Sequence, residues 1–174
     1  CGNNIRGVVK GFIMENGIMV PPVAVKKVAE RLGLRIRRAP AEEELSGFLY
    51  RDHRNKSAVI GVNAAHHPNR QRFTIGHELG HYLLHEQNGI HVDRRFDVPL
   101  KRTRSRDGTS DEEKEATLFA AELLMPEELL KTELAAIERF DLEHEASMVQ
   151  LAERYAVSVQ ALSFRLANLG LVAI

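Results

Sequence analysis

Two histidines and a glutamate in the middle of the chain have the spacing of a metal-dependent hydrolytic centre. They occur in the string His77-Glu78-Leu79-Gly80-His81. On a helix His77 and His81 lie one turn apart, so both imidazoles can reach a single Zn²⁺ at about 2.0–2.1 Å. Glu78 can reach a water on that metal without binding the metal itself. The pattern therefore indicates a metal-activated water with Glu78 as its general base.

The residues around this motif predict the helix that must carry it. The pattern from Asn69 to Glu86 is helical, and Pro68 stands where a first turn would begin. The two imidazoles lie about 40° apart on such a helix, and apolar or small residues fill the opposite arc. These residues are Phe73, Gly76, Leu79, Gly80, Leu83 and Leu84. One face is thus a core stripe, and the other presents the candidate ligands.

A catalytic site needs a third protein ligand, and this helix does not supply one. His85 lies about 12 Å along the axis from His77, so one ion cannot be shared by both. Leu84 and Gln87 stand where a metzincin would have its turn glycine and third histidine. A carboxylate on a second helix is the usual alternative.

Candidates for that carboxylate cluster in the acidic segment that follows Ser110. Glu112, Glu113 and Glu115 are nearly equivalent on composition alone. Ser110 and Glu113 also form a capping box, in which the glutamate merely ties down the start of a helix. The residues themselves therefore leave the third ligand open among three glutamates.

The elements before the motif predict an α+β fold. Helical spacing over residues 22–32 ends at Gly33. Three strand-like runs follow, at 34–37, 48–51 and 58–62. We expect a small antiparallel three-stranded sheet packed on the metal-binding helix, followed by a mostly helical C-terminal half.

Two later segments bear on possible partners. Residues 87–110 lack periodicity and predict a surface loop, whose basic cluster at 94–106 could touch phosphates or act as a lid. Residues 144–170 predict a helix pair resembling a helix-turn-helix, with Ser158 capping the second helix. Arg165 is the one basic side chain over residues 158–165. We therefore favour a structural pair and expect no direct nucleic-acid binding.

Composition excludes several other classes of protein. The chain has 174 residues with 24 basic and 24 acidic side chains, so no net charge favours nucleic acid or a membrane surface. A single cysteine, Cys1, excludes intrachain disulfides, and no apolar run is long enough to span a bilayer. We expect a cytoplasmic protein with residues 1–20 as an N-terminal extension or linker and 21–174 as one domain. The terminal Cys1 fits a processed lipoprotein, a trimmed chain or a fragment, and Met14 is a plausible native start.

Two motifs together resemble the ImmA/IrrE family of metallopeptidases. The first runs from Arg72 to His85, and the second runs from Glu113 through an apolar pattern to Pro126. That second motif reads Glu113-x-x-Ala116-x-x-Phe119-Ala120-x-x-Leu123-Leu124-Met125-Pro126. The resemblance covers most of residues 20–170.

This resemblance implies a gluzincin-like fold and a full set of site residues. It assigns His77, His81 and Glu113 as ligands of one Zn²⁺ ion and Glu78 as the catalytic base; Mn²⁺ also suits such a ligand set. Thr117 stands where relatives often carry Asn or Asp beside a metal-bound histidine. The family's members come from bacteria, phages and mobile elements. The resemblance implies that the substrate is a helix-turn-helix repressor, cut to release stress or transfer genes.

Two further features of such peptidases stay open. An extended substrate usually lies along a sheet edge beside the metal helix, and residues 58–62 are our candidate edge, with an interior strand as the alternative. Tyr82, His144 and Tyr155 could each stabilise an oxyanion, and nothing in the sequence selects one.

Two functions fit these observations. The first is a zinc endopeptidase that cleaves a protein substrate at few sites. The second is a non-catalytic regulator that binds a repressor or a toxin–antitoxin partner through the same surface. Glu78 separates the two, because a structural metal site has no need of a general base.

Overall fold

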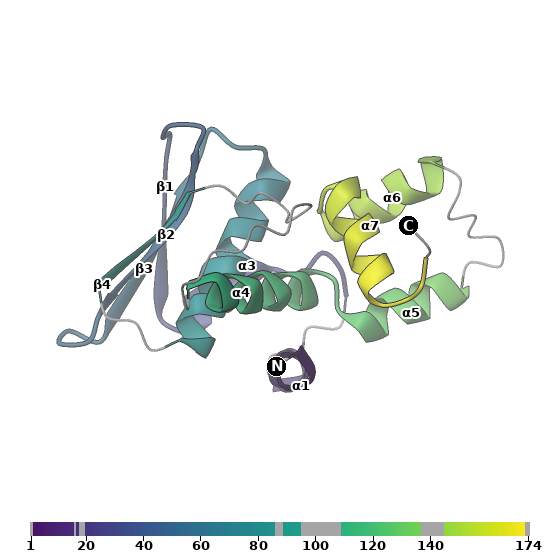
Figure 1. Ribbon diagram of the computed structural model, residues 1–174, viewed down its shortest axis with the longest axis horizontal. Coiled ribbons are helices and arrows are strands. Elements are labelled where there is room, and N and C mark those ends of the chain that lie inside the picture. The colour runs from purple at the N-terminus through teal and green to yellow at the C-terminus, as the bar shows by residue number, and fades with distance from the viewer. Residues whose placement is uncertain are drawn as a thin grey trace.

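A computed structural model of the chain combines helices with a single sheet (Figure 1). It describes residues 2–15, 17, 20–85, 89–94, 109–136 and 145–172. In chain order the elements are α1 (Gly2–Glu15), α2 (Val25–Arg31), β1 (Leu34–Ala39), β2 (Leu45–Asp52), β3 (Ser57–Asn63), α3 (Pro68–Leu84), β4 (Gly89–Arg94), α4 (Thr109–Leu124), α5 (Glu127–Ala136), α6 (Glu145–Tyr155) and α7 (Val159–Asn168). The predicted mixture of helix and strand is confirmed, and the three predicted strands fall inside β1, β2 and β3.

The sheet differs from the prediction in both strand number and pairing. The described residues form four strands in the order β1-β3-β2-β4, so the expected three-stranded sheet is wrong. β1 runs parallel to β3, with Leu34 opposite Ala58, whereas β2 is antiparallel to both β3 and β4. The sheet is therefore mixed, and the expected antiparallel order is wrong as well.

Asn63 explains how β1 reaches the far side of β3. The connection from β1 to β2 crosses the end of β3, where the Asn63 side chain is buried. Its amide donates to the carbonyls of Ala41, Glu42 and Leu45, and its oxygen accepts from the backbone N–H of Ala41. One side chain thus satisfies the backbone of the crossing segment, which local strand patterns cannot reveal.

The fourth strand lies inside the segment that we predicted to be a loop. Residues 89–94 form β4, whose His91 pairs with Leu49 of β2. Ile90 and Val92 alternate with His91, but they face away from the core and are 66% and 47% exposed. An exposed apolar pair in so short a run is a weak strand signal, and this is why the loop prediction failed here.

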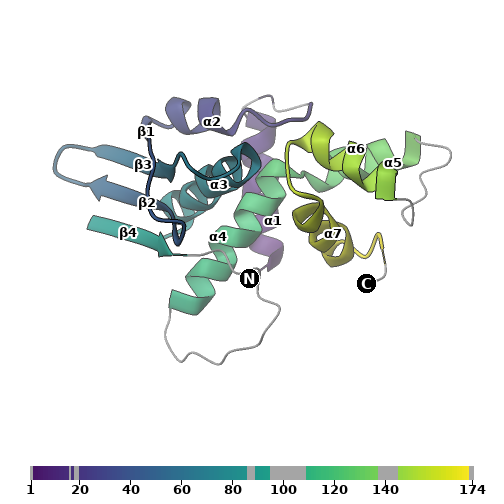
Figure 2. The same cartoon turned by 90° about the horizontal axis from the view of Figure 1, so that it is seen from above.

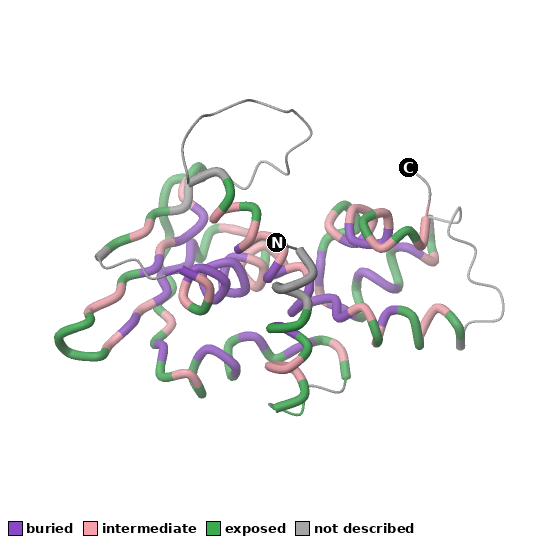
Figure 3. The backbone as a smooth tube through the Cα atoms, turned by 60° about the horizontal axis from the view of Figure 1, so that its bottom comes forward, coloured by how far each residue is buried: buried purple, intermediate pink, exposed green. Residues whose placement is uncertain are grey.

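One face of the sheet packs on helices, and Tyr50 and Ile90 on the other face are exposed. α3 packs against β2 and β3, and α2 packs against β1. Figure 1 shows α3 to one side of the sheet, and Figure 2 shows α2 beside β1. Leu49, Ile60 and Val62 fill the covered face and are buried. Figure 3 shows buried positions running through both this half and the C-terminal helices.

Helices α3 and α4 approach closely because glycines face small residues at their crossing. A Cβ built on Gly80 would lie 2.8 Å from the Cα of Ala116 and 3.0 Å from its carbonyl oxygen. One turn earlier, a Cβ on Gly76 would lie 3.3 Å from the Cβ of Ala120. The two glycines of the motif helix therefore permit an approach that a larger residue at position 80 would prevent.

The C-terminal helices are anchored to α4 by a buried ion pair. The Arg165 guanidinium of α7 donates to both carboxylate oxygens of Glu122 at 2.7 and 2.6 Å, and its Nε donates to the Met125 carbonyl at 3.1 Å. Ser158 caps α7 by accepting from the N–H of Ala161, as predicted. Because Arg165 is 2% exposed, the basic side chain of this helix is directed into the protein.

The remaining predictions concern the N-terminal segment and residues that the structure does not describe. Residues 2–15, inside the segment expected to be an extension or linker, form α1, and Val9 is buried against the rest of the core. The basic loop over 95–106 and His144 lie outside the described residues. No helix in the described part of the chain is both long enough and apolar enough to cross a membrane.

We expect Gly80→Ala to destabilise the protein by about 1–2 kcal/mol. Overpacking against the α4 backbone costs about 1–3 kcal/mol, and the better helix propensity of alanine recovers up to about 1 kcal/mol. Gly76→Ala is the matched control, because its nearest contact is a methyl group rather than backbone. Urea unfolding followed by circular dichroism measures both, and a Gly80→Ala variant as stable as Gly76→Ala would contradict this account.

Candidate metal centre

The motif helix holds its two histidines on a buried face, one turn apart. The side chains of His77 and His81 are 0% and 2% exposed, and their Nε2 atoms lie 2.9 Å apart. Pro68 occupies the first turn of α3 as predicted, and the His67 ring accepts from the N–H of Asn69 to cap the start. Two ring nitrogens at this distance need a proton or a cation between them.

Arg51 of β2 fixes the other end of α3. Its guanidinium donates to the carbonyls of Tyr82 at 2.7 Å, His85 at 3.1 Å and His81 at 3.4 Å. A cation at a helix C-terminus is favourable both for these carbonyls and for the helix dipole. The sheet thereby holds the last turn of the helix that carries the site.

Glu113 of α4 meets both histidines. One carboxylate oxygen lies 3.2 Å from His77 Nε2, and the other lies 3.3 Å from His81 Nε2. Burial alone would raise the pKa of Glu113, but hydrogen bonds from the surrounding rings lower it well below its usual range. Of the three glutamates that the residues left open, Glu113 joins this group and Glu115 contacts His85 instead.

A third histidine, which we did not predict, completes the group. His91 of β4 lies 3.0 Å from a Glu113 carboxylate oxygen, and its ring centroid lies 4.0 Å from that of His81. It was missed because its segment was predicted to be a loop. The alternation of Ile90, His91 and Val92 is the signal that could have found both the strand and the histidine.

The donor set fits a divalent metal ion. The ligand atoms of His77, His81, His91 and Glu113 all lie within 4.8 Å of one another. Tetrahedral coordination at about 2.0–2.1 Å places ligand atoms about 3.3 Å apart, and Glu113 lies 3.2 and 3.3 Å from the Nε2 atoms of the two helical histidines. Three imidazole nitrogens and a carboxylate are donors that zinc accepts.

Burial also keeps the rings in the form that binds a metal. Desolvation lowers the pKa of His77 to about 4, against the opposing effect of its hydrogen bond with Glu113. The same desolvation lowers the pKa of His81. Both rings are therefore neutral at pH 7, and neutral imidazole is the metal-binding species.

Glu78 directly follows His77 and is buried on α3. Its side chain is 0% exposed, and Oε1 lies 3.7 Å from the place that a Cβ on Gly47 would occupy. A residue larger than glycine at position 47 would also meet Thr74 and the Gly61 carbonyl oxygen. β2 therefore leaves room beside Glu78.

Both candidate ligands of α3 have partners behind their rings. Thr117 Oγ1 lies 3.4 Å from His77 Nδ1, in the position where the resemblance placed a supporting residue. His85 Nδ1 lies 3.1 Å from His81 Nδ1, and His85 Nε2 lies 3.2 Å from a Glu115 oxygen. His85 therefore lies outside the donor group and contacts one of its members, His81.

The other sequence candidates lie elsewhere. The Tyr82 ring packs against the Arg51 guanidinium, and Tyr155 is buried among the C-terminal helices. The candidate edge strand at 58–62 is wrong, because β3 pairs with β1 on one side and β2 on the other. β4 is the edge strand next to the site.

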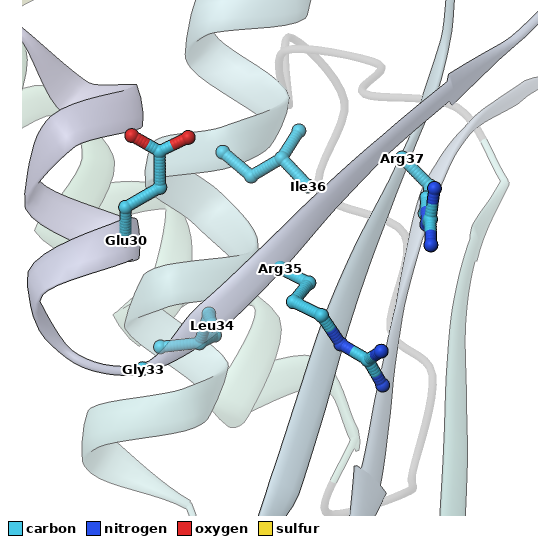
Figure 4. Close-up of a pocket in the computed structure, with 6 residues that line it drawn as sticks. All are labelled: Glu30, Gly33, Leu34, Arg35, Ile36 and Arg37. Carbon is cyan, nitrogen blue, oxygen red and sulfur yellow. The ribbon is translucent and has the colours of Figure 1, made fainter.

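A separate hollow lies at the turn between α2 and β1. Figure 4 shows Arg35 and Arg37 directed to one side of β1, away from Glu30 and Ile36. Gly33 and Leu34 complete its lining. It contains none of the candidate ligands, so we do not connect it with the metal centre.

Comparisons with known proteins agree with this geometry. A family model described as the IrrE N-terminal-like domain, Peptidase_M78, matches residues 29–167. The metallopeptidase ImmA of Bacillus subtilis (strain 168) is 28% identical over 127 residues, covering 73% of this chain and 66% of that protein. The uncharacterized immunity region protein 2 of Bacillus phage phi105 is 36% identical over 84 residues, covering 48% of this chain and 47% of that protein.

The chain thus spans less than two thirds of the length of these two curated relatives. The family match, in contrast, extends from residue 29 to residue 167, a range that contains the sheet, α3, α4 and nearly all of α7. It includes every residue of the four-membered donor group. The chain therefore belongs to the ImmA/IrrE family of metallopeptidases.

Proposed function

We propose that the protein is a zinc-dependent endopeptidase in which His77, His81 and Glu113 hold one metal ion and Glu78 is the general base. The convergence of these ligand atoms from α3 and α4 carries the proposal. Family membership and the metallopeptidase name of the Bacillus relative support the same reaction class.

The bound metal would supply a Lewis acid that acidifies a water and polarises a peptide carbonyl. Glu78 would accept a proton from that water as its oxygen bonds to the carbonyl carbon. The same carboxylate would then give the proton to the amide nitrogen as the C–N bond breaks. A peptide and a water are thereby converted to a carboxylic acid and an amine, with Glu78 returned to its starting form.

His91 has a different role in this proposal. A catalytic zinc site keeps one position open, so four permanent protein ligands would be one too many. His91 is the member of the group that comes from the edge strand, and it is 19% exposed, against 0% and 2% for the two helical histidines. We assign it as the hydrogen-bond donor to the oxygen that gains charge during attack.

The edge strand also suggests where the substrate binds. Among the described residues β4 pairs with β2 alone, so its other edge can receive an extended peptide beside His91. We propose that this peptide belongs to a helix-turn-helix repressor. The immunity-region name of the phage relative is in keeping with a repressor substrate.

The alternative is a non-catalytic regulator that binds a repressor or toxin–antitoxin partner. In such a regulator the metal bound by these side chains would only stabilise the fold. A buried glutamate beside the ligands favours the enzyme, because an ionisable group is costly to bury and a structural site gains nothing from it.

Replacing Glu78 with glutamine tests the reaction. Glu78→Gln keeps the shape of the side chain but removes the base, so we expect cleavage of a candidate helix-turn-helix repressor to fall about 10²–10⁴-fold. Zinc content, measured by elemental analysis, should stay at one ion per chain. Glu112→Gln is the control, because it makes the same change on α4 outside the donor group and should leave both quantities unchanged. Full cleavage by Glu78→Gln would reject the mechanism.

Replacing His91 separates an oxyanion donor from a ligand. We expect His91→Ala to retain zinc while cleavage falls about 10²–10³-fold, as on loss of one oxyanion donor. Elemental analysis after gel filtration and a cleavage assay on the same sample give the two values. Loss of zinc from this variant would show that His91 is a fourth ligand, contrary to the assignment.

A further inference from the structure

We infer that His85 and Glu115 form a relay that fixes the ring orientation and tautomer of His81, and so set the metal affinity of the site. This inference rests on the proposed metal site and goes beyond it, because neither residue belongs to the donor group. Both are positioning residues rather than catalytic ones.

The relay is a continuous chain of three side chains. His81 presents Nε2 to Glu113 and His77, and its other nitrogen, Nδ1, lies 3.1 Å from Nδ1 of His85. The far nitrogen of His85, Nε2, lies 3.2 Å from a carboxylate oxygen of Glu115. His81 and His85 are 2% and 9% exposed, so water has little access to the contact between these two rings.

The order of these contacts determines where each proton must be. A neutral imidazole carries one N–H, so His81 can offer Nε2 to a metal only with its proton on Nδ1. That N–H must donate to Nδ1 of His85, which is then unprotonated. The His85 proton therefore lies on Nε2, where it donates to the Glu115 carboxylate, a group that can only accept.

Glu115 determines which nitrogen of each ring in the relay carries the proton. Without an acceptor at that end, His85 could also carry its proton on Nδ1, facing His81. The N–H of His81 would then move to Nε2, and this ring could no longer bind a metal. An anionic group two residues after the ligand Glu113 thus excludes the non-binding tautomer of His81.

The two ligands of α3 differ in this respect. His77 is backed by the Thr117 hydroxyl at 3.4 Å, a neutral group that can donate as well as accept. A hydroxyl therefore does not select a tautomer, whereas the relay does. We expect the metal affinity to depend more on the partners of His81 than on the partner of His77.

His85 also has a structural contact, which involves its backbone and not its ring. The His85 carbonyl oxygen accepts from Arg51, which helps to end α3, but this contact uses the backbone and survives a change of side chain. Side-chain variants at position 85 therefore test the relay without removing that cap.

The test measures zinc affinity by competition with a chelator, on the full chain. We expect His85→Phe and Glu115→Ala each to weaken zinc binding about 10–100-fold, as found for partners behind metal-bound histidines. Glu115→Gln should recover part of the loss, because its amide oxygen still accepts from His85. Glu112→Ala, which removes a carboxylate from the same helix, should bind zinc like the wild type. The visible spectrum of the Co²⁺-loaded protein should shift in the first two variants, reporting a changed ligand geometry.

The outcomes separate this inference from the proposed function. Zinc affinity within twofold of the wild type in both His85→Phe and Glu115→Ala would overturn the relay alone. A wild-type protein that binds no zinc would overturn the relay and the metal site together. Weaker zinc binding in the variants of a protein that cleaves no substrate would support the relay and reject the peptidase. Thermal unfolding of the metal-free variants shows whether they fold; if His85→Phe does not, the two Glu115 variants decide.

Discussion

The close crossing of α3 and α4 is the constraint on which the candidate site depends. Gly80 lies so near the backbone of Ala116 that any side chain there would push the helices apart. Glu113 lies one turn before Ala116 and reaches both histidines of α3 only because the helices are this close. Helix packing and metal chemistry are therefore set by the same contact, and the glycine inside the motif is part of the site's geometry.

The sheet contributes from the other side of α3. Arg51 of β2 binds the carbonyls at the end of the helix, and Gly47 of the same strand leaves space near Glu78. β4 brings His91 to Glu113. β2 and β4 thus contact different parts of the centre. The four clustered side chains of the centre come from α3, β4 and α4 rather than from one loop.

Sequence patterns predicted the parts of the molecule that depend on local periodicity. The motif helix, its proline start and the Ser158 cap all follow from residues close together in the chain. The parallel pairing of β1 with β3 depends instead on Asn63 and a crossing segment about twenty residues away, which no local pattern encodes. Family resemblance, rather than spacing, singled out Glu113 among three glutamates. His91 was missed because its strand is short and carries its apolar residues on the exposed face.

The ion pair between Glu122 and Arg165 has a consequence for how this family can vary. Glu113 and Glu122 are nine residues apart on one continuous helix, which places them about 180° apart around its axis. One carboxylate is directed to the histidines and the other to the C-terminal helices. Inserting or deleting one residue between them would rotate one end by about 100° against the other, so both could not be satisfied at once. Insertions and deletions in related chains should therefore fall before Glu113 or after Glu122. The nine-residue spacing of the two glutamates should be retained even where the residues between them change.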